Sequence, residues 1–307
     1  MSKELPMPRM FTGVLTALLT PFKGDAVDMA AFGRFVEWQI AQGINGLVVN
    51  GTTGEAPTLS DAEQDALLAE ALKIAAGRVP VMAGTGSNNT HHVIERTRAA
   101  ARAGAQAALI VTPYYNKPTQ EGLYQHFKAV HDATDLPIFI YNIPGRSVVD
   151  MSVETLARLA ALPRIAGVKD ATADLARPLR VRTEIGPDFI QLSGEDATVA
   201  AFYAQGGHGV ISVTSNIAPR LCVDLHQAWL AGDLAGMAAL RDRLMPLHAA
   251  LFCESSPAPV KYAASVLGLA APDVRLPLVS ASAAARSRVD DALQQAAITP
   301  VALKAVS

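Results

Sequence analysis

The sequence LPIFIYNIPGRSVVDMSVETLARLAALPRIAGVKD, residues 136–170, holds a pattern that recurs along the chain. Its two short apolar runs, 137–142 and 165–169, are continuous rather than alternating, which is typical of parallel strands covered by helices. Between them Ser152 can cap a helix whose apolar side chains recur on one face. The stretch therefore predicts a strand, a helix and a second strand parallel to the first.

Six further apolar runs rich in β-branched residues bring the number of predicted strands to eight. Helical patterns separate them, with Asp28 as one cap and Ser60 with Glu63 as a capping box. This alternation predicts an α/β protein, a (β/α)8 TIM barrel. The six additional runs are 13–21, 46–50, 79–84, 107–113, 189–194 and 209–216.

After residue 216 the alternation stops, and residues 218 to 297 show helical patterns only. A length of 307 residues suggests about two domains, although α/β barrels often exceed 200 residues as one unit. We expect a barrel catalytic domain at residues 1–224. Residues 225–307 are expected to form a C-terminal helical extension that packs on the barrel and is not an independent domain.

The composition excludes several classes of protein. Half of the residues are hydrophobic and 18% are charged, which excludes wholesale disorder. The net charge is −2 and there is no basic stripe, so we expect no nucleic-acid partner. Two isolated cysteines fit a reducing compartment. There is no apolar leader and no apolar run of 18 residues, so we expect a soluble, cytoplasmic protein without a membrane partner.

The active site of a TIM barrel lies at the C-terminal ends of its strands, which directs attention to Lys169. It follows an apolar run directly, so its stem would lie in an apolar wall. Burial lowers the pKa of a lysine, and a neutral amine can form a Schiff base with a carbonyl. Position alone slightly favours the alternative, a lysine that is solvated or paired with Asp170.

Three further features stand at predicted strand ends. The Tyr141 hydroxyl could reach the Lys169 nitrogen and transfer protons, or Tyr141 could simply be a core residue. The turn GTTGE at 51–55 offers backbone N–H groups and the hydroxyls of Thr52 and Thr53 to a carboxylate, or it merely joins two elements. Arg146 could hold a second carboxylate through two hydrogen bonds, or it is an ordinary surface arginine.

The seven histidines form none of the usual metal-binding patterns, and no phosphate-binding glycine motif is present. We therefore expect no metal site. His208 lies among glycines at residues 206–209 and is interpreted as part of a structural turn.

Three motifs together resemble the dihydrodipicolinate synthase / N-acetylneuraminate lyase superfamily of class I aldolases. They are GTTGE at 51–55, YNIP at 141–144 and VKD at 168–170, which would carry the Schiff-base lysine. In this order the set is specific, and the resemblance covers essentially the whole chain from residue 12. The synthase branch is most similar, on the evidence of Thr52, of TPYYNKP at 112–118 and of Arg146.

The resemblance implies condensation of pyruvate with L-aspartate 4-semialdehyde, the first committed step of the diaminopimelate route to lysine. Pyruvate would form a covalent imine on Lys169, without a metal or a dissociable cofactor. A homo-oligomer is also implied, commonly a dimer of dimers in this family. The resemblance assigns a proton relay to Tyr141, Thr52 and Tyr115 (the last from a neighbouring subunit), the pyruvate carboxylate to Thr53, the semialdehyde to Arg146, and the lining of the pyruvate pocket to Gly194 and Ile211.

Two alternatives remain at this point. One is another pyruvate-dependent class I aldolase, such as an N-acetylneuraminate lyase or a 2-keto-3-deoxy sugar acid aldolase, against which Arg146 and Tyr115 argue. The other is a non-catalytic ketoacid sensor, which would not need Tyr141 and Tyr115 together with Lys169.

We predict weak or absent inhibition by lysine. His92 replaces the glutamate that would hold the lysine amine in lysine-inhibited relatives, and positions 61 and 64 hold Asp61 and Gln64 where a histidine would be expected. Initial rates measured over a series of lysine concentrations check this. A submicromolar inhibition constant would contradict it.

Overall fold

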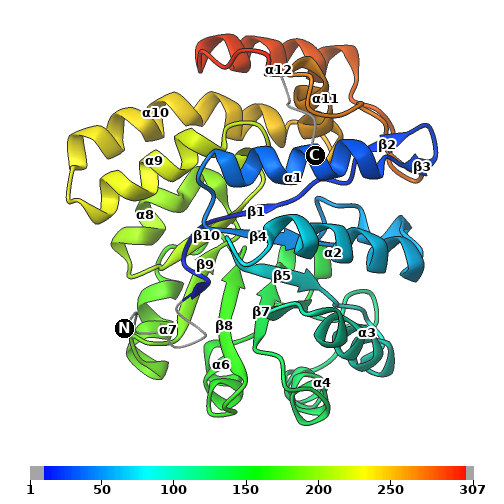
Figure 1. Cartoon of the computed structure of the whole chain (residues 1–307). Helices are drawn as coiled ribbons and strands as arrows, with labels where there is room; N and C mark the ends of the chain where they lie inside the picture. Colours follow the sequence, from blue (N-terminus) through cyan, green and yellow to red (C-terminus); the bar gives the residue numbers. More distant parts are fainter. Residues whose placement is uncertain (1–9, 302–307) are drawn as a thin grey trace. The chain divides into compact units, whose positions relative to one another are not determined.

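The structure is a computed structural model that describes residues 10–301. Eight parallel strands close a barrel in the order β1-β10-β9-β8-β7-β6-β5-β4. All eight predicted strands form, with bounds that differ by a few residues from the predicted runs (Figure 1). They are β1 Gly13–Ala17, β4 Gly46–Val49, β5 Val81–Gly84, β6 Ala107–Val111, β7 Ile138–Asn142, β8 Ile165–Asp170, β9 Ile190–Ser193 and β10 Gly209–Ser212.

Within the described residues the chain divides into two compact units. We call residues 10–13 and 80–211 the central unit, and residues 14–79 and 212–301 the flanking unit. The predicted boundary at residue 224 is a different division, and it stays a prediction.

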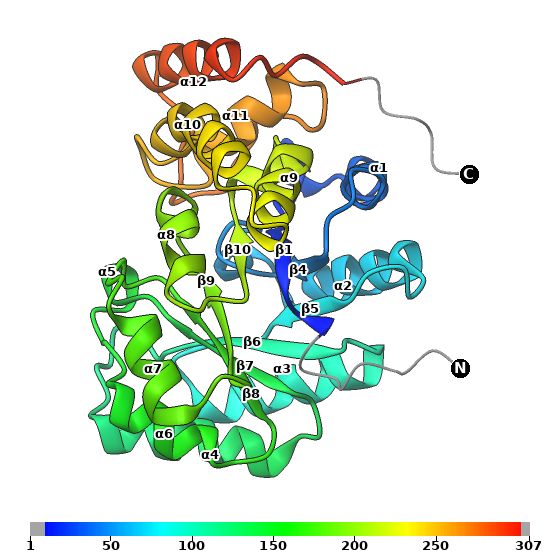
Figure 2. The same cartoon turned by 90° about the vertical axis from the view of Figure 1, so that its left-hand side faces the viewer.

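In the central unit the strands are followed by helices that pack in sequence. The contacts run from α3 (Thr90–Ala103) to α4 (Gln120–Ala133), then to α6 (Val153–Ala160) and α7 (Arg177–Ile185), as Figure 2 also shows. Ser152 caps α6 as predicted, because its hydroxyl accepts a hydrogen bond from the Thr155 backbone N–H. The remaining helical segments are α5 Pro144–Ser147, η3 Asp196–Thr198 and α8 Val199–Ala204.

The flanking unit is built from both ends of the chain. Its N-terminal part holds α1 (Met29–Ala41) and α2 (Asp61–Ala75), which pack on each other. The predicted cap Asp28 and the capping box of Ser60 with Glu63 are both confirmed. Its C-terminal part is helical, as predicted for this stretch. The other elements are β2 Phe22–Lys23, β3 Ala26–Val27, η2 Ala56–Thr58, η4 Thr214–Asn216, α9 Pro219–Leu230, α10 Leu234–Leu251, α11 Ala258–Val266 and α12 Ala283–Gln295.

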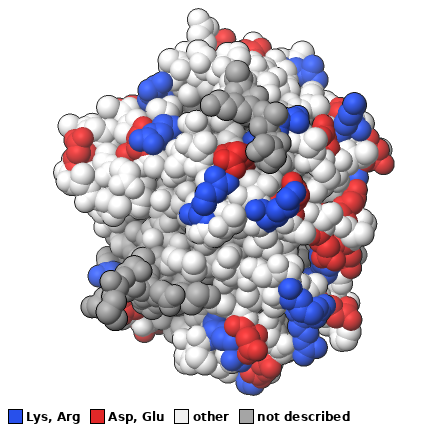
Figure 3. All heavy atoms as spheres, in the orientation of Figure 1, with Lys and Arg blue, Asp and Glu red and all other residues white. Residues whose placement is uncertain are grey.

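Charged side chains of both signs are intermixed on the face drawn in Figure 3. Among residues 10–301, none of the helices combines the length and the apolar character that a membrane span requires. Neither Cys222 nor Cys253 forms a disulfide, and Cys222 is buried.

Gly167 lets β8 approach its two neighbouring strands closely. A Cβ atom at this position would lie 2.7 Å from Cε1 of Phe139 on β7, and it would also overlap the Ile190 carbonyl oxygen on β9. Neither neighbour can move easily, because Phe139 is fully buried and Ile190 is held in the sheet. Only glycine fits between these strands.

We expect Gly167→Ala to lower the free energy of unfolding by about 1–3 kcal/mol, because an added methyl group overpacks the core. Gly145→Ala is the matched control, since nothing lies within 4 Å of the position of its added Cβ. Urea unfolding of both variants measures the effect. Equal midpoints would show that the strand approach is not tight.

Candidate active site

Lys169 lies at the carboxyl end of β8 and only 6% of its surface is exposed. Burial lowers the pKa of its amine most strongly, the charges of Asp196 and Glu195 raise it, and the charge of Arg146 lowers it; together they leave the pKa at about 8. A solvated lysine is therefore excluded. The amine is poised so that a usable fraction is neutral at physiological pH.

Asp170, the partner offered by the alternative interpretation, is held by other groups. Its Oδ2 lies 2.8 Å from Nε of Arg177. Its Oδ1 accepts hydrogen bonds from the hydroxyl and the backbone N–H of Thr172, at 2.6 and 2.9 Å. Asp170 thus anchors the chain after β8 and does not neutralise Lys169.

Tyr141 is the direct neighbour of Lys169 in the sheet. The parallel register of β7 and β8 pairs Tyr141 with Lys169 and Asn142 with Asp170. The Lys169 Nζ lies 4.0 Å from the centre of the Tyr141 ring. The two strand ends lie side by side, and the contact runs through the face of the ring, where a cation is favoured; the reach of the Tyr141 hydroxyl to the nitrogen stays a prediction.

Arg146 lies on α5, directly after β7, and its side chain is exposed. It forms no ion pair within the described part of the chain, yet its charge acts on Lys169. A free guanidinium near a reactive amine is suited to hold a carboxylate through two hydrogen bonds.

Gly194 and Ile211 also belong to the central unit. The Gly194 N–H donates to the Asp170 carbonyl at 2.6 Å, and a Cβ on Gly194 would lie 2.6 Å from that of Ala171. Ile211 is buried on β10. The backbone of Gly194 therefore packs closely against the residues at the end of β8. A side chain at position 194 would clash with Ala171 and prevent this contact.

Tyr115 differs from the other predicted residues because it is 89% exposed. Its φ of 72° lies in the left-handed region, which a tyrosine rarely adopts. The loop after β6 therefore holds this ring away from the rest of its own chain.

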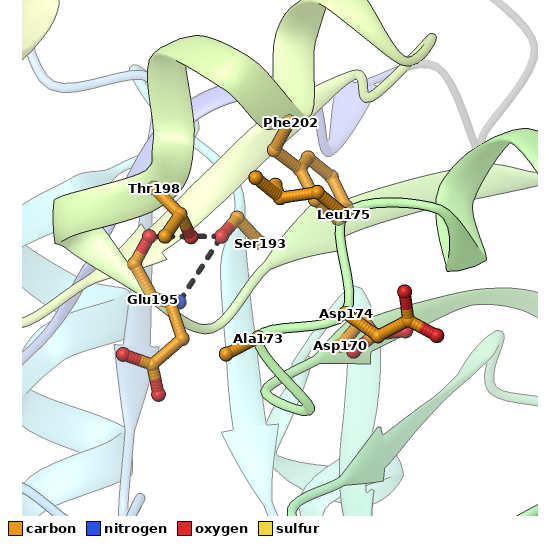
Figure 4. A pocket seen from close by; sticks show the side chains of 8 residues that line it. All are labelled: Asp170, Ala173, Asp174, Leu175, Ser193, Glu195, Thr198 and Phe202. Carbon is orange, nitrogen blue, oxygen red and sulfur yellow. Dashed lines mark hydrogen bonds between the residues drawn. The ribbon is translucent and has the colours of Figure 1, made fainter.

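Two acidic residues after β9 were not predicted as part of the site. Burial and the nearby charge of Asp196 raise the pKa of Glu195, and both carboxylates act on Lys169. Glu195 lines a small pocket with Asp170 and Asp174, and its backbone N–H donates to the Ser193 hydroxyl at 3.0 Å (Figure 4). The sequence could have indicated them, because two carboxylates stand in a row directly after the apolar run at 189–194.

Thr52 and Thr53 belong to the flanking unit, and their place in one site with the residues above stays a prediction. Thr53 is buried and Thr52 is exposed. Their turn is closed by hydrogen bonds from the Glu55 N–H to the Thr52 carbonyl and from the Gly54 N–H to the Gly51 carbonyl, at 3.0 and 3.1 Å. The predicted tight turn is therefore present.

No cluster of three or more potential metal-ligating His, Cys, Asp or Glu side chains occurs in residues 10–301. His208 has the structural position that its sequence context suggested, because its Nδ1 accepts a hydrogen bond from the Gln191 N–H at 3.1 Å. The absence of a metal or a dissociable cofactor stays a prediction.

Comparisons with known proteins identify the family of the chain. A family model described as the dihydrodipicolinate synthetase family matches residues 10–296. A 4-hydroxy-tetrahydrodipicolinate synthase of Rhodospirillum centenum is 64% identical over 284 residues, which cover 92% of this chain and 98% of the relative.

Solved structures give the same answer. The dihydrodipicolinate synthase of Thermotoga maritima superimposes with a TM-score of 0.92 at 41% identity, covering 94% of this chain and 99% of the other. The chloride-inhibited enzyme of Acinetobacter baumannii, in complex with pyruvate, gives a TM-score of 0.91 at 44% identity with the same coverage. The chain belongs to the dihydrodipicolinate synthetase family.

Proposed function

We propose that the chain acts as a 4-hydroxy-tetrahydrodipicolinate synthase, which condenses pyruvate with L-aspartate 4-semialdehyde. The observation that carries this proposal is Lys169, a buried amine with a pKa lowered to about 8 at the end of a barrel strand. The names of the relatives support the same activity and give no support to a neuraminate lyase or a sugar acid aldolase.

The chemistry follows from a neutral amine in a protected site. The Lys169 nitrogen attacks the keto carbon of pyruvate, and the carbinolamine loses water to give an imine. Loss of a methyl proton gives an enamine, whose carbon attacks the aldehyde. The amine of the semialdehyde then closes the ring and displaces Lys169, which regenerates the enzyme. Lys169 is the electron sink, so the route needs neither a metal nor a dissociable cofactor.

The other residues take the roles that the family resemblance gives them. The exposure of Tyr115 supports its supply to a neighbouring subunit, and hence a homo-oligomer such as a dimer of dimers. We place the enzyme in the cytoplasm, a reducing compartment that suits a biosynthetic enzyme whose two cysteines form no disulfide. Tyr141, Thr52 and Tyr115 form the proton relay, Thr53 binds the pyruvate carboxylate, Arg146 holds the semialdehyde, and Gly194 and Ile211 line the pyruvate pocket.

A coupled assay tests the proposal directly. The chain is mixed with pyruvate and aspartate semialdehyde, dihydrodipicolinate reductase is added, and loss of NADPH is followed. Turnover that disappears in Lys169→Ala supports the proposal. If there is no turnover but borohydride still traps pyruvate on Lys169, the second substrate is not aspartate semialdehyde but another aldehyde.

We expect imine formation to depend on pH with a midpoint near 8. At pH 7 about a tenth of the Lys169 amine is neutral, so the rate rises about tenfold per pH unit below the pKa and levels off above it. Rapid mixing with pyruvate, followed by borohydride quenching at each pH, measures this rate. Lys169→Ala is the control without trapping, and a midpoint near 10.5 would show that burial does not activate the amine.

We expect Arg146→Ala to impair the semialdehyde step far more than imine formation. Loss of a bidentate hydrogen-bonded contact between an arginine and a carboxylate costs about 1.5–3 kcal/mol. This corresponds to a decrease of roughly 10- to 100-fold in kcat/KM for the semialdehyde. Borohydride trapping of pyruvate is expected to stay within about twofold of the parent. Equal losses in both measurements would argue against this role.

A further inference from the structure

A fully buried ion pair connects the two parts of the flanking unit. The side chains of Lys261 on α11 and of Glu55, the last residue of the 51–55 turn, are both 0% exposed, and Nζ lies 2.5 Å from Oε1. The Lys261 Nζ also donates to the Asp273 carbonyl at 2.6 Å and lies 3.9 Å from the centre of the Phe22 ring. These three contacts leave the ammonium a single position.

The Glu55 carboxylate is held on both of its oxygens. Oε1 accepts from Lys261, and Oε2 accepts from the Arg275 backbone N–H at 3.0 Å. The Glu55 backbone has a φ of 56°, in the left-handed region that non-glycine residues rarely occupy. The side chain therefore fixes a residue whose backbone conformation is otherwise unfavourable.

From Glu55 the constraint passes to the predicted carboxylate-binding turn. The Glu55 N–H donates to the Thr52 carbonyl at 3.0 Å. Gly54, between Thr53 and Glu55, is held as well, because its carbonyl accepts a hydrogen bond from the Thr20 hydroxyl at 2.7 Å. Thr52 and Thr53 are thus followed directly by two anchored residues, and one anchor is held by a lysine 206 positions away in sequence.

Stability alone does not account for such a pair. Two charges removed from water lose much of their hydration, and a well-packed apolar pair of similar size is often as stable or more so. An apolar pair, however, forms no hydrogen bonds, so it does not fix the orientation of the side chains. The ion pair differs in that it specifies the orientation of the Glu55 side chain and of the backbone attached to it.

We propose that Lys261 is a positioning residue for pyruvate: through Glu55 it holds the turn of Thr52 and Thr53 in the geometry that receives the pyruvate carboxylate. This inference rests on the proposed function, because it takes the role of the turn from there. Lys261 itself does not touch the substrate.

The test is the double variant Glu55→Gln/Lys261→Met, compared with the parent chain. It buries no unpaired charge, and the new amide keeps an acceptor for the Arg275 N–H, so we expect a thermal midpoint close to that of the parent. We expect the KM for pyruvate to rise roughly 10- to 100-fold, because a turn displaced by a fraction of an ångström binds the carboxylate poorly. The KM for the semialdehyde is expected to stay within about twofold.

Glu63→Gln is the matched control. Glu63 forms an ion pair with the same Arg275 at 2.5 Å, but it caps α2 and has no bond to the turn. Both KM values are expected to equal those of the parent. If the double variant does not fold, Glu55→Gln/Lys261→Gln replaces it, because it removes both charges and keeps polar groups at both positions.

The possible outcomes are distinct. A double variant with the pyruvate KM of the parent, or with both KM values raised equally, overturns the positioning role and leaves the proposed function intact. A parent chain that neither traps pyruvate under borohydride nor turns over overturns the proposed function and this inference with it.

Discussion

The parallel register of β7 and β8 is the constraint from which the central unit derives its chemistry. It pairs Tyr141 with Lys169, so that the amine lies over an aromatic ring instead of beside a carboxylate. Gly167, two residues earlier, allows the close strand approach that fixes this register. A shift by one residue would turn the Lys169 side chain to the opposite face of the strand and remove it from the site.

Local patterns predicted much of this fold. Continuous apolar runs located all eight barrel strands, and the caps Asp28, Ser60 and Ser152 located three helix starts. The hairpin of β2 with β3 and the short helix α5 were missed, because two to four residues are too few to show a periodicity. Elements of that length are held by the surrounding structure and not by their own sequence.

The site was predicted where its residues end strands, and it was missed where contacts are distant in sequence. Lys169 and Tyr141 follow apolar runs, so their position at a barrel strand end could be deduced. The contact of Lys261 with Glu55 has no local signature, because an ion pair between residues 206 positions apart depends on the completed fold. Burial lowers the pKa of both lysines to about 8, so the pKa alone does not identify the nucleophile. Both amines lie over an aromatic ring, and what distinguishes the Lys261 amine is that it also donates to a carboxylate and a carbonyl.

The flanking unit has a consequence for how the chain is made. The central unit, apart from its first few residues, is one continuous segment, residues 80–211, whereas the flanking unit needs residues from both ends. During synthesis on the ribosome, the turn at 51–55 emerges early and α11 emerges some two hundred residues later. Glu55 therefore stays without its ammonium partner for most of translation, and domains generally fold as their residues become available. A nascent chain thus contains Lys169 before the turn at 51–55 is anchored, so truncated products that end before Lys261 carry this amine without the ion pair that holds the turn.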